Sequence, residues 1–190
     1  MSEAPAGAML CLPADACAAL CHDLPRAPDL DAALGLVEAV RQAQLGNGLL
    51  TVNIDAAPDG PQDGDTIELQ RLWTSNPDAY PVGGRKRKTM TPWTRQLLRG
   101  GELFVGEGDA VLREVFDDHA RIASLGLHAV LNVPLLEAGR CLATFNVLGS
   151  RPQWSPQEQM LVQLLAVLAT PWVLRAAAAS THAPSVAPRG

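Results

Sequence analysis

Two pairs of strand-forming segments, each joined by a turn, constrain the fold of this chain more than any other feature. Residues 48–55 and 66–74 are rich in β-branched side chains and flank a stretch of Pro, Asp and Gly. Residues 128–136 and 140–148 are two further apolar segments, joined by a turn that contains Gly139. Because strands joined by short turns pair antiparallel, this order predicts an antiparallel sheet and not a parallel one built from strand–helix–strand units.

Helical patterns precede, separate and follow these strands. Asp29 is placed to cap a helix at 29–45, which Gly46 ends. Ser155 caps a final helix that has proline at its first position. The chain is therefore expected to be α+β, with a central antiparallel sheet of five or six strands. The remaining predicted elements are helical segments at 92–98 and 109–123 and a short edge strand at 102–105.

The composition indicates one folded domain with an acidic balance of charge. The chain has 190 residues, 47% of them hydrophobic, and a formal net charge of -5. Since domains span about 100–200 residues, one core is expected. The negative charge repels a phosphate backbone, so no nucleic-acid partner is expected. The longest apolar stretch, at 160–174, is too short for a membrane span and contains Gln163 and Pro171, so no membrane partner is expected either.

The two ends of the chain differ in composition from its middle. We expect an N-terminal extension at 1–28, a folded domain at 29–175 and a disordered tail at 176–190, which is rich in Ala, Pro and Ser. The first residues contain Glu3 and no basic residue, so they lack the positive charge of a secretory signal. The protein is therefore expected to be cytoplasmic.

The four cysteines do not suggest a disulfide framework. Cys11, Cys17 and Cys21 precede His22 in the extension, whereas Cys141 lies far along the chain. The spacing of the first three fits no common zinc pattern, and no second pair of ligands follows. No metal and no cofactor is therefore predicted, and small apolar cysteines on a helix are the simpler interpretation.

Several local motifs stand out in the second half of the chain. They are Phe116–His119, Ile122, Leu125–Gly126, Val130–Leu135 before Gly139, and Thr144–Val147 before Trp154. Two further motifs precede them, Arg71–Ser75 and Tyr80–Gly84. Together they resemble the GAF domain family of small-molecule sensors, which is related to PAS domains, over roughly residues 29–175. The two further motifs are similar to a stand-alone bacterial subgroup of that family.

The resemblance implies a GAF/PAS-like sheet with the N- and C-terminal helices on one face and a ligand pocket, covered by loops and helices, on the other. Such domains bind small molecules and usually regulate an attached effector, but no effector segment is expected here. The signature of cyclic-nucleotide binders is missing, and no cysteine lies in the loop where a tetrapyrrole would attach. The implied function is a sensory domain for a small aromatic or anionic metabolite.

Polar and aromatic residues in the segments expected to line the pocket form the candidate ligand-binding site. Strict alternation along 66–74 puts Trp73 on the same face as Arg71. An asparagine on an apolar strand needs a hydrogen-bond partner, which a ligand could supply. The alternative for each residue is a structural role, in the core for tryptophan and toward the backbone for asparagine and histidine. The candidates are Trp73, Ser75, Tyr80, Trp93, His119, Asn132 and Asn146.

Two surface features suggest further interactions. The basic run Arg85–Lys88 is expected in a loop, where it either gates the pocket toward a carboxylate or phosphate ligand or is simply solvated. The final helix has almost no polar face from Leu161 to Leu174, which predicts a homodimer through the terminal helices. The alternative is that the helix at 29–45 and the extension cover this surface within one chain.

Two other functions remain open at this point. A thiol-dependent reductase of free methionine sulfoxide would use Cys141 as its catalytic residue and would need a second thiol nearby. A structural protein-interaction module would need no pocket at all. We expect a binding protein and not an enzyme.

Overall fold

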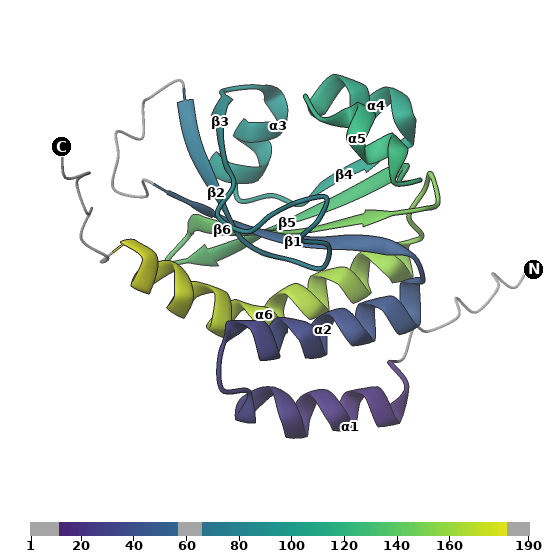
Figure 1. The fold of residues 1–190 in the computed structure, drawn as a ribbon, viewed down its shortest axis with the longest axis vertical. Helices are drawn as coiled ribbons and strands as arrows, with labels where there is room; N and C mark the ends of the chain where they lie inside the picture. The colour runs from purple at the N-terminus through teal and green to yellow at the C-terminus, as the bar shows by residue number, and fades with distance from the viewer. Residues whose placement is uncertain (1–11, 57–65, 182–190) are drawn as a thin grey trace, which may run out of the picture.

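The computed structural model describes residues 12–56 and 66–181. The strands in this part of the chain form one antiparallel sheet of six strands, which runs through the middle of the molecule in Figure 1. Its strand order is β3-β2-β1-β6-β5-β4. The strands are β1 (Gly48–Asp55), β2 (Thr66–Thr74), β3 (Arg85–Thr89), β4 (Phe104–Glu107), β5 (Ala129–Glu137) and β6 (Arg140–Gly149).

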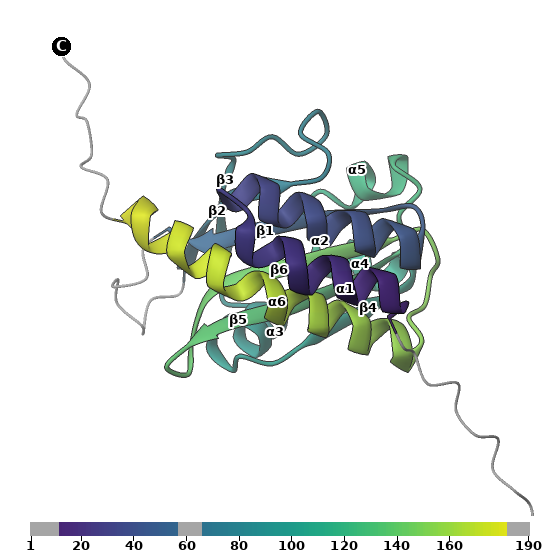
Figure 2. The same ribbon diagram turned by 90° about the horizontal axis from the view of Figure 1, so that it is seen from below.

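Helices cover both faces of this sheet. Below it in Figure 1 lie α2 (Leu30–Leu45) and α6 (Pro156–Thr181), which pack against each other, and α1 (Ala14–Asp23) lies beyond them. Figure 2, seen from below, shows α2 and α6 side by side, with α1 in front of them. The α+β fold with the terminal helices on one face is therefore confirmed. The remaining helical elements are η1 (Leu24–Arg26) after α1 and, above the sheet, α3 (Pro92–Thr94), η2 (Arg95–Arg99), α4 (Gly108–Val115) and α5 (His119–Ser124).

The starts of the two long helices follow the capping chemistry that the sequence predicts. The Asp29 carboxylate accepts a hydrogen bond from the backbone N–H of Ala32 at 2.9 Å, which satisfies a free donor of the first turn of α2. At α6, the Ser155 backbone N–H donates to the Glu158 carboxylate at 2.8 Å, and the Glu158 N–H donates to the Ser155 hydroxyl at 3.3 Å. This reciprocal pair is a capping box.

Alternation along the strands sends apolar side chains to the helices and polar ones to the opposite face. Val52 and Ile54 of β1 point toward α2 and α6 and are fully buried with Phe145 and Val147 of β6. Thr51 and Asn53, which alternate with them along β1, point to the other face together with other polar residues. The main core therefore lies between sheet and terminal helices, and the opposite face is free to carry a site.

The basic run is a strand and not the expected loop. Residues 85–89 pair antiparallel with residues 66–70 of β2 and form the outer edge of the sheet. Lysine and arginine have low strand propensity, so the local sequence did not indicate this pairing. Charged side chains do suit an edge strand, because they discourage pairing with another chain.

Two other boundaries differ from the sequence prediction. The helix predicted at 109–123 is split into α4 and α5, because the backbone is extended at Phe116 and an Asp-Asp-His sequence follows, whose side chains favour caps and turns. Helix α6 continues past 175 to Thr181, with Ala177 still buried, so residues 176–181 are helical where a disordered tail was expected. Residues 182–190 of that tail lie outside the described residues.

Helix α6 is the one described helix that is long and apolar enough to cross a membrane, over Pro156–Ser180. Its buried side packs against β5, β6 and α2 in the main core. A core helix of a folded domain passes the same test of length and composition.

Candidate functional site

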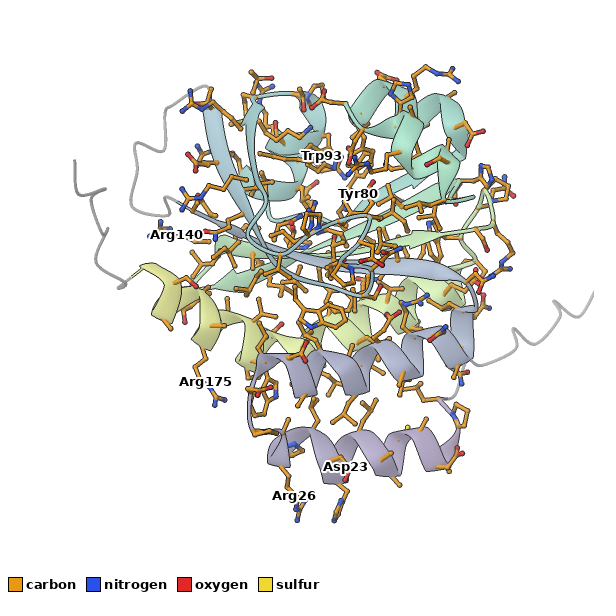
Figure 3. The ribbon with its side chains drawn as sticks, viewed as in Figure 1. Asp23, Arg26, Tyr80, Trp93, Arg140 and Arg175 are labelled. Atoms are coloured by element: carbon orange, nitrogen blue, oxygen red, sulfur yellow. The ribbon has the colours of Figure 1, made fainter. Side chains whose placement is uncertain are left out.

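A cavity of about 70 Å³ lies on the sheet face opposite to α2 and α6. Strands β1, β2, β5 and β6 form its floor, and the edge strand β3, helix α3 and residues 116–122 form its walls. Because a water molecule needs roughly 10–15 Å³ of such space, the cavity suits a compact ligand. Figure 3 shows Tyr80 and Trp93 above the sheet on this side. The cavity is lined by Leu49, Thr51, Asn53, Leu69, Arg71, Tyr80, Gly84, Lys86, Lys88, Trp93, Phe116, Asp118, Ile122, Val130, Asn132, Thr144, Asn146 and Leu148.

Aromatic rings form one side of the cavity. Trp93, at the first turn of α3, lies edge-on to Phe116 with 5.5 Å between ring centroids and edge-on to Phe104 at 6.5 Å. Thr91 holds this turn through a reciprocal capping pair with Thr94. Such edge-to-face contacts stabilise the ring positions, so the aromatic wall is preorganised.

A chain of hydrogen bonds crosses the cavity floor. The Trp93 indole N–H donates to Asn132 Oδ1 at 3.0 Å, and Asn132 Nδ2 donates to Asn146 Oδ1 at 2.8 Å. Asn146 Nδ2 then donates to the backbone oxygen of Thr51 at 3.2 Å and to the Thr144 hydroxyl at 3.1 Å. Both asparagines line the cavity as predicted, but their amides already have protein partners. They therefore position Trp93 and shape the floor without needing a ligand.

Two lysines of β3 bring positive charge to the cavity. Alternation along the strand turns Lys86 and Lys88 inward, while Arg85 and Arg87 are exposed. Lys86 Nζ lies 2.8 Å from Asp118 Oδ2. Lys88 Nζ lies 2.7 Å from Asp117 Oδ2 and 5.8 Å from the centre of the Trp93 ring. Half of the basic run therefore faces the cavity.

Arg71, Tyr80 and Asp118 form a cluster in the cavity wall. The Arg71 guanidinium lies 4.9 Å from the centre of the Tyr80 ring, and Arg121 lies 5.9 Å from the same ring. Arg71 also donates to the backbone oxygen of Pro81 at 3.2 Å, and Arg121 donates to that of Ala79 at 2.8 Å. These contacts hold the loop that carries Tyr80 against the sheet.

Burial and neighbouring charge set the ionisation of this cluster. Burial, followed by the negative charge of Asp118, raises the pKa of the Tyr80 hydroxyl well above 10, so the hydroxyl stays protonated at neutral pH. Burial opposes ionisation of Asp118, but its hydrogen bond and charge interaction with Lys86 outweigh this effect and lower its pKa. Burial also lowers the pKa of Arg71 below its usual value. At neutral pH the wall therefore carries Asp118 as a carboxylate beside cationic groups.

Arg71 Nε is buried and has no hydrogen-bond partner. Tyr80 Oη and Asp118 Oδ1 are also buried, and the Tyr80 hydroxyl interacts with the Asp118 carboxylate. Tyr80 is only 6% exposed. A buried donor or acceptor without a partner costs about 1–3 kcal/mol, and most such groups in folded proteins do have partners.

The other three predicted site residues lie outside the cavity lining. Trp73 is in the main core and donates to Asp31 of α2 at 2.8 Å. The Ser75 hydroxyl accepts from the backbone N–H of Leu50 at 3.0 Å. His119 Nδ1 lies 3.2 Å from the backbone oxygen of Phe116, beside a separate small cavity.

A β-bulge explains the position of Trp73. Val52 pairs with Trp73, but the next residue, Asn53, pairs with Arg71, so Leu72 is the extra residue. Arg71 therefore faces the cavity with Asn53, and Trp73 faces the helices with Val52. The prediction that Arg71 and Trp73 share one face was wrong. It assumed strict alternation, whereas a bulge reverses the face of the residues beyond it.

Cys141 lies outside the cavity described above. It borders a second space near Arg140 and Ala143, and its thiol donates to the Ala143 backbone oxygen at 3.2 Å. Burial raises the pKa of this thiol to about 12, which disfavours the reactive thiolate. Cys17 and Cys21 are on α1, in the layer beyond α2 and α6. This arrangement does not support thiol chemistry.

The part of the chain that the structure describes contains no group of three His, Cys, Asp or Glu side chains that could hold a metal ion. Cys11 of the proposed cysteine cluster lies outside the described residues.

Sequence reasoning missed several cavity residues. Arg71 and Asp118 lie within motifs that carried the family resemblance, but neither was chosen as a site residue. A charged residue inside an apolar strand, such as Arg71, was the available signal.

The GAF domain family model matches residues 11–170, which is most of the chain. The chain therefore belongs to the GAF domain family. No curated protein matches it in sequence.

Solved structures show the same fold at low identity. The GAF domain of a phosphoenolpyruvate-protein phosphotransferase from Coxiella burnetii is similar with a TM-score of 0.63 and 17% identity, over 87% of this chain and 94% of that one. The chromophore-binding domain of a bacteriophytochrome from R. palustris has a TM-score of 0.58 and 14% identity, over 87% of this chain. This chain spans 62% of the length of that domain. Residues 122 to 287 of a methyl-accepting chemotaxis protein have a TM-score of 0.56 and 13% identity. This match covers 85% of this chain and 98% of that one. The chain thus shares the fold of these domains, in agreement with its membership of the GAF domain family.

Proposed function

We propose that this protein is a sensory domain that binds a compact anionic metabolite in the cavity between β3, α3 and the sheet. The observation that carries the proposal is the inward orientation of Lys86 and Lys88 beside an apolar and aromatic wall. Small-molecule sites combine such walls with a few oriented polar groups. Cationic groups at the edge of a low-dielectric cavity attract a carboxylate or phosphate.

The first experiment is native mass spectrometry of the protein as purified, under gentle and then denaturing conditions. A small molecule released on denaturation supports the proposal and identifies its chemistry. Isothermal titration with pyruvate, benzoate, 4-hydroxybenzoate and inorganic phosphate then tests binding directly. If no molecule co-purifies and none of these anions binds, the proposed function is wrong.

Replacing Lys86 and Lys88 together with glutamine is expected to weaken binding of an anion at least about tenfold. The reason is that a hydrogen bond to a charged group contributes about 1.5–3 kcal/mol. The matched control replaces Arg85 and Arg87 with glutamine, because these residues occupy the same strand but are exposed. The control should bind within about twofold of the wild type, since the Debye length of about 8 Å screens distant surface charges. Equal loss in both variants would argue against the inward lysines as anion ligands.

We also propose that two copies associate through α6. Met160, Leu164 and Val167 are 65%, 44% and 66% exposed and lie on one stripe of this helix, although α1 is in place. Exposed apolar stripes of this kind are typical of association surfaces, and a copy of the same helix offers a self-complementary partner.

Leu164→Asp is expected to convert a dimer into a monomer, because a dimer would bury the new carboxylate without a partner. Sedimentation velocity measures the change. Leu125→Asp is the control, since Leu125 is similarly exposed, at 37%, but lies after α5 on the other side of the sheet. A wild-type protein that sediments as a monomer at every concentration would contradict the proposal.

A further inference from the structure

Strand β3 leaves one edge of the sheet open. Among the described residues it pairs only with β2, and it stands at the end of the strand order. An edge strand presents unpaired backbone N–H and C=O groups, which bind an extended segment of another chain when the side chains permit it. The backbone and the side chains of this edge therefore decide which partner it accepts.

The backbone groups of Arg85 and Arg87 face the open side of the edge. The N–H of Arg71 in β2 donates to the oxygen of Gly84 at 2.8 Å, and Gly84 directly precedes β3. Bonded and non-bonded pairs alternate along an antiparallel ladder. The positions of β3 that point away from β2 are therefore those of Arg85 and Arg87.

Two further hydrogen bonds agree with this assignment. The oxygen of Glu68, which lies opposite Arg87, accepts from the N–H of Ala56 at 2.8 Å, so the Glu68 backbone is turned toward β1 and away from β3. The oxygen of Thr89 accepts from the N–H of Thr91 at 3.0 Å, outside the ladder. Thr89 is two residues beyond Arg87 and faces the same way, and this turn ends the open edge.

The side chains of the same two arginines make the edge positively charged. Alternation turns them to the face opposite to the cavity, and both are exposed, Arg85 with 62% of its side chain. Glu68 supplies one carboxylate on this face, 2.7 Å from Arg85. The other ion pairs that β3 forms with described residues belong to Lys86 and Lys88, so Arg87 has no such partner. Two guanidinium groups thus share one carboxylate.

This arrangement selects the charge of a partner strand. Side chains directly opposite each other on paired strands stabilise the pair when their charges are opposite and destabilise it when they are alike. A second copy of the basic strand would place cations beside Arg85 and Arg87, so the edge disfavours self-pairing. An extended segment with two carboxylates two residues apart places one beside each arginine.

From the outward backbone groups and the two exposed arginines we infer that β3 binds an acidic extended segment of a partner protein, which adds to the sheet as a further strand. A nucleic acid matches the charge, but its sugar-phosphate backbone has no N–H groups for the carbonyl oxygens of the edge, and the net charge of -5 repels it. The inference does not depend on the proposed ligand, because these arginines and the cavity lie on opposite faces of β3.

The test is an NMR titration of the isotope-labelled full chain with a short peptide of alternating glutamate and valine, blocked at both ends. The amide signals of Arg85 and Arg87 should shift most, and their hydrogen exchange should slow, because strand pairing gives these N–H groups an acceptor. The matched peptide with lysine in place of glutamate should bind at least about tenfold more weakly. No binding of the acidic peptide, or equal binding of both peptides, would overturn the inference.

Replacing Arg85 and Arg87 together with glutamine should weaken binding of the acidic peptide at least about fivefold, because both opposite-charge pairs are lost. The control replaces Arg113 and Arg175 with glutamine, which changes the net charge equally at exposed positions of α4 and α6. The control should bind within about twofold of the wild type, since screening limits the reach of distant surface charges. Equal loss in both variants would indicate a general effect of charge and would overturn the inference.

A second comparison separates strand pairing from a purely ionic contact. Arg87→Gln and Arg87→Pro both remove the guanidinium, but only proline also removes the outward N–H, and an edge strand tolerates proline at such a position. Arg87→Pro should bind the acidic peptide at least about threefold more weakly than Arg87→Gln. Methylating the glutamate nitrogens of the peptide makes the same test on the unchanged protein and should also weaken binding. If neither change has an effect, or if single-stranded DNA binds more tightly than the peptide, the inference is wrong.

Discussion

Phe145→Ala is expected to lower the free energy of unfolding by about 3–5 kcal/mol, the usual cost of removing a large aromatic side chain from a core. Phe145 is fully buried near the centre of β6. It pairs directly with Val52 of β1 on one side and Val133 of β5 on the other, in the core between the sheet and the helices α2 and α6. The loss is large because close-packed neighbours on several elements cannot collapse into the space left behind.

Urea denaturation followed by far-ultraviolet circular dichroism measures this effect. Leu136→Ala is the control, because Leu136 lies in the same hairpin but is 42% exposed, so its removal should cost less than about 1 kcal/mol. A loss below about 1 kcal/mol for Phe145→Ala would contradict the central role of this position. Since small domains are stable by about 5–15 kcal/mol, the expected loss is a large share of the total.

Asn132→Ala is expected to cost about 2–4 kcal/mol although it removes no apolar contact of the main core. The substitution leaves the Trp93 indole N–H and Asn146 Oδ1 without the partners that they have in the native protein. Both residues are less than a tenth exposed, so water cannot easily replace the missing amide.

A double-mutant cycle isolates this hydrogen-bond chain from other effects of the substitution. Trp93→Phe removes the indole donor, so it should cost less by at least about 1 kcal/mol in the Asn132→Ala background than in the wild type. Far-ultraviolet circular dichroism is again the probe, because the tryptophan itself changes. Strictly additive losses would show that the two side chains are not coupled.

Phe145 and Asn132 lie on opposite faces of the sheet, and the two faces have different roles. The helix face, around Phe145, supplies most of the buried apolar surface and therefore the stability. The opposite face carries a smaller apolar cluster and the polar chain that holds Trp93 over the cavity. Changes in the cavity wall, such as those at Lys86 and Lys88, are therefore expected to affect binding more than folding.

Much of the fold could be predicted from local sequence patterns. Both hairpins, the short edge strand and the long terminal helices were found because alternation, helical spacing and capping residues are local signals. The strand β3 was missed because its pairing with β2 depends on residues that are distant in sequence. The break between α4 and α5 was missed because the apolar spacing continues across it.

The candidate site was predicted less completely. Trp93, Tyr80, Asn132 and Asn146 were expected in the cavity and do line it. Whether an asparagine faces a ligand or another side chain depends on what lies across the sheet, and here Asn132 and Asn146 lie opposite each other on β5 and β6. Residue type alone cannot distinguish these two cases.

The sequence by itself determined the order of the elements, the capped starts of α2 and α6, and the division of β1 and β6 into an apolar and a polar face. Only the tertiary structure decided that Trp73 packs against α2 while Arg71 faces the cavity, because the bulge between them exists only once β1 and β2 pair. Only the tertiary structure brought Lys86 beside Asp118. Lys86 lies on the edge strand β3 and Asp118 at the start of α5, so the two are far apart in sequence. Local sequence patterns indicate which face of a strand or helix a residue occupies. The chemistry of a site depends on which residues, far apart in sequence, come together on that face.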